Sequence, residues 1–308
     1  MNHRNHIDPA ADLDDEIRRI SGRRIAGSLK WLRRIREQPA EAVHEVRKDL
    51  KRLRALVRLL QDTLGKRRHR KLQRDLRNAG RLLSAFRDAE VRLQLVKNLV
   101  DQSDPAARRA LEEAVERIQS VHQGTVKTED LEEAADEVMT LLRGARRRLR
   151  VWVVPSEGLG KQMEGALFRS FEKARLAMRR TLIHPVAENF HDWRKACKTL
   201  RHQLDLVMQP GGEGGEHPRI GTLHELSEHL GNLNDLDVLE ESLEPLAEGT
   251  LDIAGLSAIR RELEERRTEL VRESWAAGEG IFSREAENFI PLRGHCPAFS
   301  ETWLDSPG

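Results

Sequence analysis

Histidine, arginine and lysine recur at one fixed spacing in two places of the chain. The pattern H-x-x-R-K-x-x-K-x-x-R occupies residues 44–54 and returns at residues 191–201. At 100° per residue these positions share one side of a helix, so each copy predicts a row of cations along a helix surface. Such a row can neutralise successive phosphates of a polyanion through charge-assisted hydrogen bonds. The candidate binding residues of the two motifs are His44, Arg47, Lys48, Lys51, Arg54, His191, Arg194, Lys195, Lys198 and Arg201.

Further cations flank both motifs. Arg58 continues the first row by one helical turn, and a hairpin that turns at Gly65 would set a second basic helix beside it. That second helix carries Arg67, Arg70, Lys71, Arg74 and Arg81. A shorter basic row precedes the second motif and consists of Arg169, Lys173 and Arg180. We therefore add to the candidate binding residues Arg58, Arg74, Arg81, Arg169, Lys173 and Arg180.

The repeat extends beyond the motifs without a gap. The same offset of 147 residues maps the acidic pair Asp88 and Glu90 onto Asp235 and Asp237. A single offset over so long a stretch indicates an internal repeat, and we expect two copies of one helical unit around a pseudo-twofold axis. The second copy is less basic after its motif. The equivalents there of Arg70, Lys71, Arg74 and Arg81 are His217, Pro218, Gly221 and Glu228.

A charged helix face is most often only solvated, and this alternative has to be weighed. Along each motif like charges stand at i,i+3 and i,i+4, where each pair destabilises a helix by about 0.2–0.5 kcal/mol. A mixed surface containing glutamate would give the same solubility without that cost. The chain repeats the costly arrangement, on a polar side that reads as purely cationic, and this favours binding over simple solvation.

Charge is segregated along the chain although the formal net charge is only +2. The net charges of residues 1–17, 18–97, 98–142, 143–202 and 203–308 are −4, +17, −7, +10 and −14. Local fields can therefore be strong. The chain has no tyrosine and only 4% aromatic residues, which argues against nucleic acid because single strands are bound by aromatic stacking. A phosphate polymer without bases fits the composition best, with a nucleic-acid-binding or scaffold protein as an alternative.

Other features of the composition bear on the compartment. The sequence contains no run of eighteen apolar residues, so we expect no membrane-spanning helix. Its polar N-terminus lacks the apolar segment of a signal peptide. The two cysteines, Cys197 and Cys296, provide no disulfide framework and favour a reducing cytoplasm.

Helical periodicity runs along the whole chain, so we predict an all-α fold without a convincing strand. Breaks are expected at glycine and proline, above all at Gly65 and in the stretch PGGEGGEHP at residues 210–218. The predicted helices span about 13–37, 40–64, 66–100, 105–122, 129–152, 159–183, 187–208, 219–246 and 253–278.

Acidic residues and histidines leave room for other chemistry. A metal at either motif histidine is disfavoured, because each is followed at i+3 and i+4 by cations. A hydrogen bond to phosphate and a packing role both fit these histidines better. The acids Asp88, Glu90, Asp235 and Asp237 read best as ion-pair partners of the basic rows, with a metal-dependent phosphohydrolase as the alternative. His224, Glu225, Glu228 and His229 share a helix face but give only a weak metal signal. We predict no catalytic residue, metal ligand or cofactor.

The sequence resembles the CHAD family (conserved histidine α-helical domain) over about residues 12–285. The resemblance is carried by HEVRKDLKRLR with RDAEV, by HDWRKACKTLR with LGNLNDLDV, and by GLGKQMEGALFRSFEKARLAMRR between them. It implies two similar helical bundles with a basic central groove or pore. It also implies binding of inorganic polyphosphate by the ten motif residues, often at polyphosphate granules, without catalysis by this domain.

The resemblance also yields a domain assignment. We expect a flexible segment at residues 1–11, a CHAD-like domain at 12–290 and a tail at 291–308. Within the domain, repeat 1 spans about 12–125, a linking helix about 129–152 and repeat 2 about 158–280. No triphosphatase-type β-barrel accompanies the domain in this sequence, so a stand-alone version is expected. The implied partners are polyphosphate and, with it, proteins of polyphosphate metabolism in the cytoplasm; no membrane is expected.

Overall fold

The structure is a computed structural model that describes residues 6–8, 11–84, 128–153, 158–208, 217–247, 253–283 and 286–290, with residues 86, 97, 108 and 112. Within this part of the chain every regular element is an α-helix, which confirms the predicted all-α class. Most of the predicted helix at 105–122, most of residues 85–100 at the end of the predicted helix at 66–100, and the tail at 291–308 lie outside the described residues, as do Asp88 and Glu90.

A first group of four helices forms a bundle in which each helix contacts two others. Its members are α1 (Leu13–Arg33), α2 (Pro39–Leu59), α3 (Gln61–Leu82) and α6 (Thr128–Arg150). Proline is suited to the first position of α2, because an N–H group at that position would have no intrahelical partner and its absence therefore costs nothing. The side of α2 opposite its cations is buried as predicted, with Val46, Leu50, Leu53 and Val57 in the core. The predicted linking helix, α6, packs on α1 and α3 inside this bundle.

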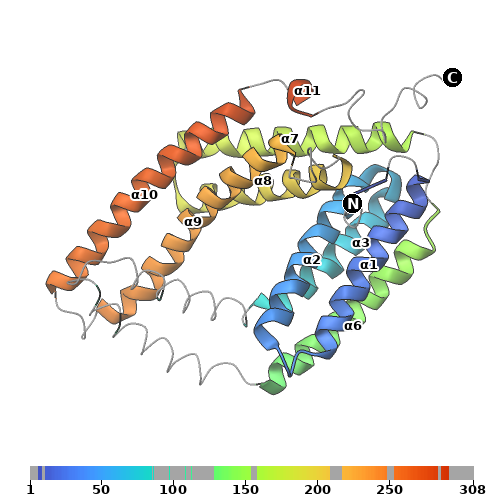
Figure 1. Ribbon diagram of the computed structural model, residues 1–308, viewed down its shortest axis with the longest axis horizontal. Coiled ribbons are helices and arrows are strands. Elements are labelled where there is room, and N and C mark those ends of the chain that lie inside the picture. Colours follow the sequence, from blue (N-terminus) through green and yellow to red (C-terminus); the bar gives the residue numbers. More distant parts are fainter. Residues whose placement is uncertain are drawn as a thin grey trace.

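A second group follows along the chain, and its long helices pack in sequence order (Figure 1). It contains α7 (Leu159–Ile183), α8 (Ala187–Val207), α9 (Pro218–Ala247) and α10 (Ile253–Phe282), while the short α11 (Ala286–Phe289) lies against α7. Trp193 of α8 is fully buried and stacks on Trp275 of α10, with ring centroids 5.1 Å apart. Gly278 leaves room for that indole, since a Cβ there would lie 2.7 Å from Trp193 Cζ2.

The predicted break at Gly65 is confirmed. Its φ of 71° and ψ of 151° lie outside the helical region and interrupt α3 near its start. Glycine adopts positive φ without the steric cost that a Cβ brings. The interruption separates α2 from the long basic part of α3, and the two helices pack on each other. The second basic helix is therefore set beside the first motif, as the sequence indicated.

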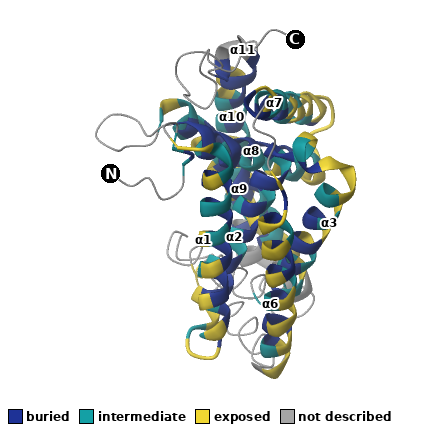
Figure 2. Cartoon of the chain, turned by 90° about the vertical axis from the view of Figure 1, so that its right-hand side faces the viewer, coloured by how far each residue is buried: buried dark blue, intermediate teal, exposed yellow. Residues whose placement is uncertain are grey.

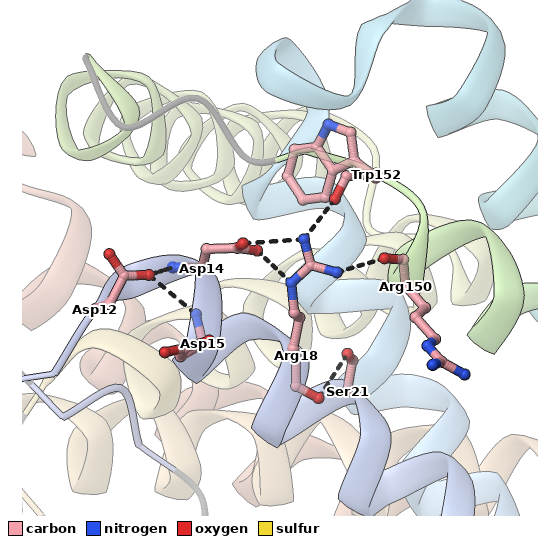
Figure 3. A network of polar contacts seen from close by, with 7 residues as sticks. All are labelled: Asp12, Asp14, Asp15, Arg18, Ser21, Arg150 and Trp152. Atoms are coloured by element: carbon pink, nitrogen blue, oxygen red, sulfur yellow. Dashed lines mark hydrogen bonds and ion pairs between the residues drawn. The ribbon is translucent and has the colours of Figure 1, made fainter.

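A polar network fixes the start of α1 against the end of α6 (Figure 3). Asp12 caps α1 by accepting hydrogen bonds from the backbone N–H groups of Asp14 and Asp15, at 2.9 and 3.2 Å. Arg18 pairs with Asp14 at 2.7 Å and donates to the backbone carbonyls of Arg150 and Trp152. A cation therefore already satisfies carbonyls at and just beyond the C-terminal end of α6.

The two groups meet through α2 and α3 on one side and α7 and α8 on the other. The contact between α2 and α8 joins the two motif helices directly. Figure 2 shows buried residues along the inner sides of the helices and exposed residues on the outer sides of α6 and α7. Among the described residues, no helix has the length and apolar character needed to cross a membrane.

Candidate functional site

The two motif helices touch through polar side chains near the middle of the molecule. Arg58 of α2 donates from Nη1 to Thr199 Oγ1 of α8 at 2.8 Å. Nearby, the buried Gln203 of α8 donates to the backbone carbonyl of Ala55 at 3.5 Å. These contacts hold the C-terminal parts of both motifs against each other, so cations that are 147 residues apart in sequence share one region of the structure.

Lys198 lies where the positive charges of both helices converge. Burial lowers its pKa to about 8, and the neighbouring charges of Arg194, Lys51 and Arg201 add to that lowering. Glu228 of α9, with an oxygen 3.9 Å from the ammonium, opposes it. Because the charge of Lys51 acts on the pKa of Lys198, the two motifs are close enough to interact electrostatically.

Arg54 and Arg58 are held in a similar field on the α2 side. Burial lowers the pKa of Arg54 to about 10, and the charges of Arg58 and Arg77 contribute. Burial and the charge of Arg77 likewise lower the pKa of Arg58. Arg77 belongs to α3, so a third helix adds its charge to the region where the motif helices meet.

An open hollow of about 1530 Å³ lies beside this region, mainly along α3. We call it the basic hollow, because nine of the thirteen described residues that line it are lysine or arginine and none of the thirteen is acidic. No acid among these described lining residues therefore neutralises its positive charges. The lining residues are Arg58, Leu64, Gly65, Lys66, Arg67, Arg68, His69, Arg70, Lys71, Gln73, Arg74, Arg77 and Arg148.

Of the sixteen predicted site residues, only Arg58 and Arg74 line the basic hollow. Arg81 is exposed near the end of α3 and donates to Asn78 Oδ1 at 2.6 Å. On α7, Arg169 pairs with Asp62 of α3, whereas Lys173 and Arg180 are exposed further along the helix. The α7 row therefore contacts the first group at one end only.

The motif rows are not purely cationic, which corrects one expectation. Lys48 lies 3.1 Å from Glu45, and Lys195 lies 3.2 Å from Asp192, in each case three residues back on the same helix. These acids fill the i−3 position and offset part of the like-charge repulsion. Arg47 is directed to the backbone, since its Nη1 donates to the carbonyl of Gly80 at 2.9 Å. It thereby ties α2 to α3.

The two motif histidines have different surroundings. His44 is exposed, with 53% of its side chain accessible and Nε2 at 3.9 Å from Glu45. His191 is half-buried, and its Nδ1 lies 2.6 Å from Asn234 Oδ1 of α9. Burial lowers the pKa of His191, and the charge of Lys195 acts in the same direction. His191 thus packs against α9 and hydrogen-bonds there, whereas His44 faces solvent.

The acids of the second repeat have different partners from one another. Asp237 pairs with Arg267 of α10 at 2.6 Å, which is not a residue of the basic rows. Burial raises the pKa of Asp235, while the charges of Arg194 and Lys198 oppose that rise. In the described part of the chain, no three His, Cys, Asp or Glu side chains group in a way that could hold a metal ion.

Comparison with known protein families shows to which family the chain belongs. A model of the CHAD domain matches residues 22–244. The chain belongs to the CHAD family. The crystal structure of the CHAD domain from the plant Ricinus communis is similar in fold, with a TM-score of 0.56 and 18% sequence identity over 92% of both chains. No curated protein matches the chain.

The stretch matched to the CHAD domain contains both motif helices and the basic hollow, together with residues that the motif spacing did not reveal. His202 is buried beside the motif, and burial, with the charges of Arg201 and Arg52, lowers its pKa to about 3. Thr199 bridges to α2, and Arg77 adds its charge from α3. Only the basic composition of α3 pointed to Arg77; nothing in the spacing singled out Thr199 or His202.

Proposed function

We propose that this chain binds inorganic polyphosphate and carries out no catalysis on it. The observation that carries the proposal is the contact between α2 and α8, which brings two basic motifs together beside the basic hollow. Like charges gathered in partly buried positions cost free energy in the absence of an anion, as the lowered pKa of Lys198 indicates. A polyanion would reverse that cost by supplying negative charge to all of them at once.

Unused hydrogen-bond donors support the same conclusion. The Nε atoms of Arg54, Arg194 and Arg201 are buried and have no hydrogen-bond partner among the described residues. Buried donors are nearly always paired in folded proteins, so donors left over at one site favour a ligand rich in acceptors. Phosphate oxygens are strong acceptors for guanidinium groups. Three of the ten motif residues therefore have capacity for a phosphate ligand.

Polyphosphate suits the site better than nucleic acid because the lining offers charge without stacking surfaces. The described residues that line the basic hollow include no Phe, Trp or Tyr. Single-strand binding sites gain about 1–3 kcal/mol per base from aromatic stacking. A chain of phosphates needs only the cations. We propose that the basic hollow and the facing parts of α2 and α8 form one binding groove, and that the protein associates with polyphosphate granules and with proteins of polyphosphate metabolism.

Binding of long-chain polyphosphate, single-stranded DNA and RNA should be compared at equal phosphate concentration and near-physiological salt. We expect clear preference for polyphosphate, with affinity that falls steeply as salt is raised. Equal affinity for DNA would overturn the specificity. Incubation with Mg²⁺ or Mn²⁺ should release no phosphate; release that depends on Asp235 would favour the phosphohydrolase instead.

Charge reversal supplies the matched test of the site. Lys51→Glu with Lys198→Glu should weaken binding about a hundredfold or more, since a hydrogen bond to a charged group contributes about 1.5–3 kcal/mol. The control is Arg260→Glu with Arg261→Glu, which makes the same charge change at exposed positions of α10. Equal effects of the two pairs would show that only net charge matters, and the motif would have no special role.

A further inference from the structure

Four exposed arginines cover the outside of α6, a helix that contains neither motif. They are Arg143, Arg146, Arg147 and Arg150, and we call them the α6 belt. At 100° per residue they fall within an arc of about 100°, and they extend about 10 Å along the helix axis. Among the described residues, none of the four side chains forms an ion pair with an acid.

Helix electrostatics account for only half of the belt, because Arg147 and Arg150 lie in the last turn of α6 and the other two arginines do not. Positive charge is favourable near a helix C-terminus, but the effect falls off within the last turn, and Arg143 lies about two turns from the end. Arg18 of α1 already binds the carbonyl of Arg150 and thereby supplies a cation at this end. The guanidinium of Arg150 itself points away from that network (Figure 3). The belt therefore adds positive charges near a helix end at which Arg18 already binds the backbone carbonyl of Arg150.

The acids of the described residues do not neutralise the belt either. The exposed acids of α6 lie in its first half, and the last of them, Glu137, precedes Arg143 by six residues. Side chains pair along a helix at separations of three or four, so Glu137 is out of register with Arg143. The outer side of α6 is acidic in its first half and basic in its second.

A cluster around Asp75 connects the belt to the basic hollow. The Asp75 side chain is only 4% exposed, and Arg148 of α6 pairs with it at 2.9 Å. Lys71 lies 3.1 Å from the same carboxylate, and Arg74 lies 4.0 Å from it. One buried carboxylate thus faces three cations, all of which line the basic hollow. Positive charge remains in excess where α6 meets α3.

The cations of α6 continue from that cluster around the helix. Arg148 points toward α3, and Arg147 is about 100° further round, on the outer side. With Arg148, the belt spans about 200° of the circumference of α6. Basic side chains therefore lead without an acidic interruption on α6 from the hollow to the outer surface of the first bundle.

We propose that the α6 belt binds the part of a long polyphosphate chain that emerges from the basic hollow. This inference rests on the proposed function, because the same ligand occupies both places. A chain anchored in the hollow presents its next phosphates to the belt at high effective concentration, so each extra contact adds to affinity without a second binding event. The belt makes affinity depend on chain length, since a short chain held in the hollow does not extend to the belt on the outer side of α6.

The test compares tripolyphosphate with long-chain polyphosphate on one variant, Arg143→Gln with Arg146→Gln and Arg147→Gln. For long chains the slope of log affinity against log salt should become shallower by about 2, because about 0.7 counterion is released per contact on a single strand. For tripolyphosphate, affinity and slope should stay unchanged. The control is Arg260→Gln with Arg261→Gln and Arg272→Gln, three exposed arginines of α10. Circular dichroism and melting temperature confirm that each variant is folded.

The possible outcomes distinguish a failure of the belt proposal from a failure of the proposed polyphosphate binding on which it rests. Unchanged long-chain binding in the α6 variant would overturn the belt and leave polyphosphate binding intact. Equal weakening for both chain lengths would also overturn it, because the belt would then be acting on the hollow. If the α10 control weakened long-chain binding equally, the effect would depend only on the net charge of the protein, and the belt would have no special role. If neither polymer binds the unaltered protein, the proposed function itself fails.

Discussion

Replacing Lys198 with methionine should stabilise the free protein at neutral pH and weaken its binding of polyphosphate. Only 24% of the Lys198 side chain is exposed. Burial, and then the charge of Arg194, lowers its pKa from 10.5 to about 8, against the opposing charge of Glu228. Methionine has a similar length and no charge, so Lys198→Met removes the cost of burying the ammonium while it keeps most of the packing.

The magnitude follows from the two pKa values. Between pH 8 and pH 10.5 the unfolded chain holds the Lys198 proton and the folded protein has lost it. The free energy of unfolding therefore rises with pH in this window, and below pH 8 the full cost of the charged side chain is present. A difference of about 2.5 in pKa corresponds to about 3 kcal/mol at most. The variant should gain up to that amount at pH 7 and lose the advantage by about pH 10.5.

Urea unfolding at pH 7 and pH 10 measures this difference, with Lys195→Met as the control. Lys195 belongs to the same motif but is 61% exposed and pairs with Asp192 at 3.2 Å. Its replacement should change stability by no more than about 0.5 kcal/mol at either pH. If Lys198→Met is no more stable than the unaltered protein at pH 7, the argument from burial is wrong. Equal shifts from the two variants would refute it as well.

Lys198 should also make the binding of polyphosphate depend on pH. Phosphates beside Lys198 favour its charged form, so the bound state holds the proton to higher pH than the free protein does. Affinity should therefore fall above pH 8, by about tenfold between pH 7 and pH 9 if the ligand restores the ordinary pKa of a lysine. Isothermal titration at the two pH values measures it, and a matching fall for Lys198→Met would show that another group is responsible.

Three further predictions concern stability and use urea unfolding. Burial, and then the nearby Arg and Lys charges, lowers the pKa of His202 to about 3, so the unfolded chain takes up its proton first on acidification. Between pH 6.5 and pH 4 the native protein should lose about 3 kcal/mol more than His202→Gln does; parallel curves would contradict this. Gly278→Ala should cost about 1–3 kcal/mol, because its Cβ would meet Trp193 at 2.7 Å, whereas Gly280→Ala, with nothing within 4 Å, should gain up to about 1 kcal/mol. Thr199→Val leaves a partly buried guanidinium of α2 without its acceptor and should cost about 1–3 kcal/mol, while Thr199→Ser should restore most of it.

Local features of the fold were predictable from the sequence because they depend on neighbouring residues. Apolar positions at helical spacing placed Val46 and Leu50 of α2 in the core, and both are buried. Gly65 was expected to interrupt the chain, and its positive φ does so. Helix ends were less accurate. α1 was expected to reach residue 37 but ends at Arg33, because residues 34–38 form a turn that leads into Pro39.

The site was predictable as two rows of charge but not as one surface. Spacing alone treats Lys195 and Lys198 alike, since both belong to the same motif. Their difference in exposure arises from the packing of α8 on α2 and α9, which is a long-range property of the fold. Thr199 was not predicted for the same reason. A threonine inside a helix has no recognisable role in the sequence, and its hydrogen bond from Arg58 depends on how α2 and α8 pack.

The structure also explains why a doubled motif need not give equal halves. The first motif has the basic part of α3 beside it, and that helix supplies most of the lining of the basic hollow. The second motif has α9 beside it, which brings Glu228 to 3.9 Å from Lys198 and Asp235 into the field of Arg194. The net field at the second motif is therefore weaker, because acids on α9 stand where α3 carries cations. If a polyanion binds, the first group of helices attracts it more strongly, while the second closes the site through the contact between α2 and α8.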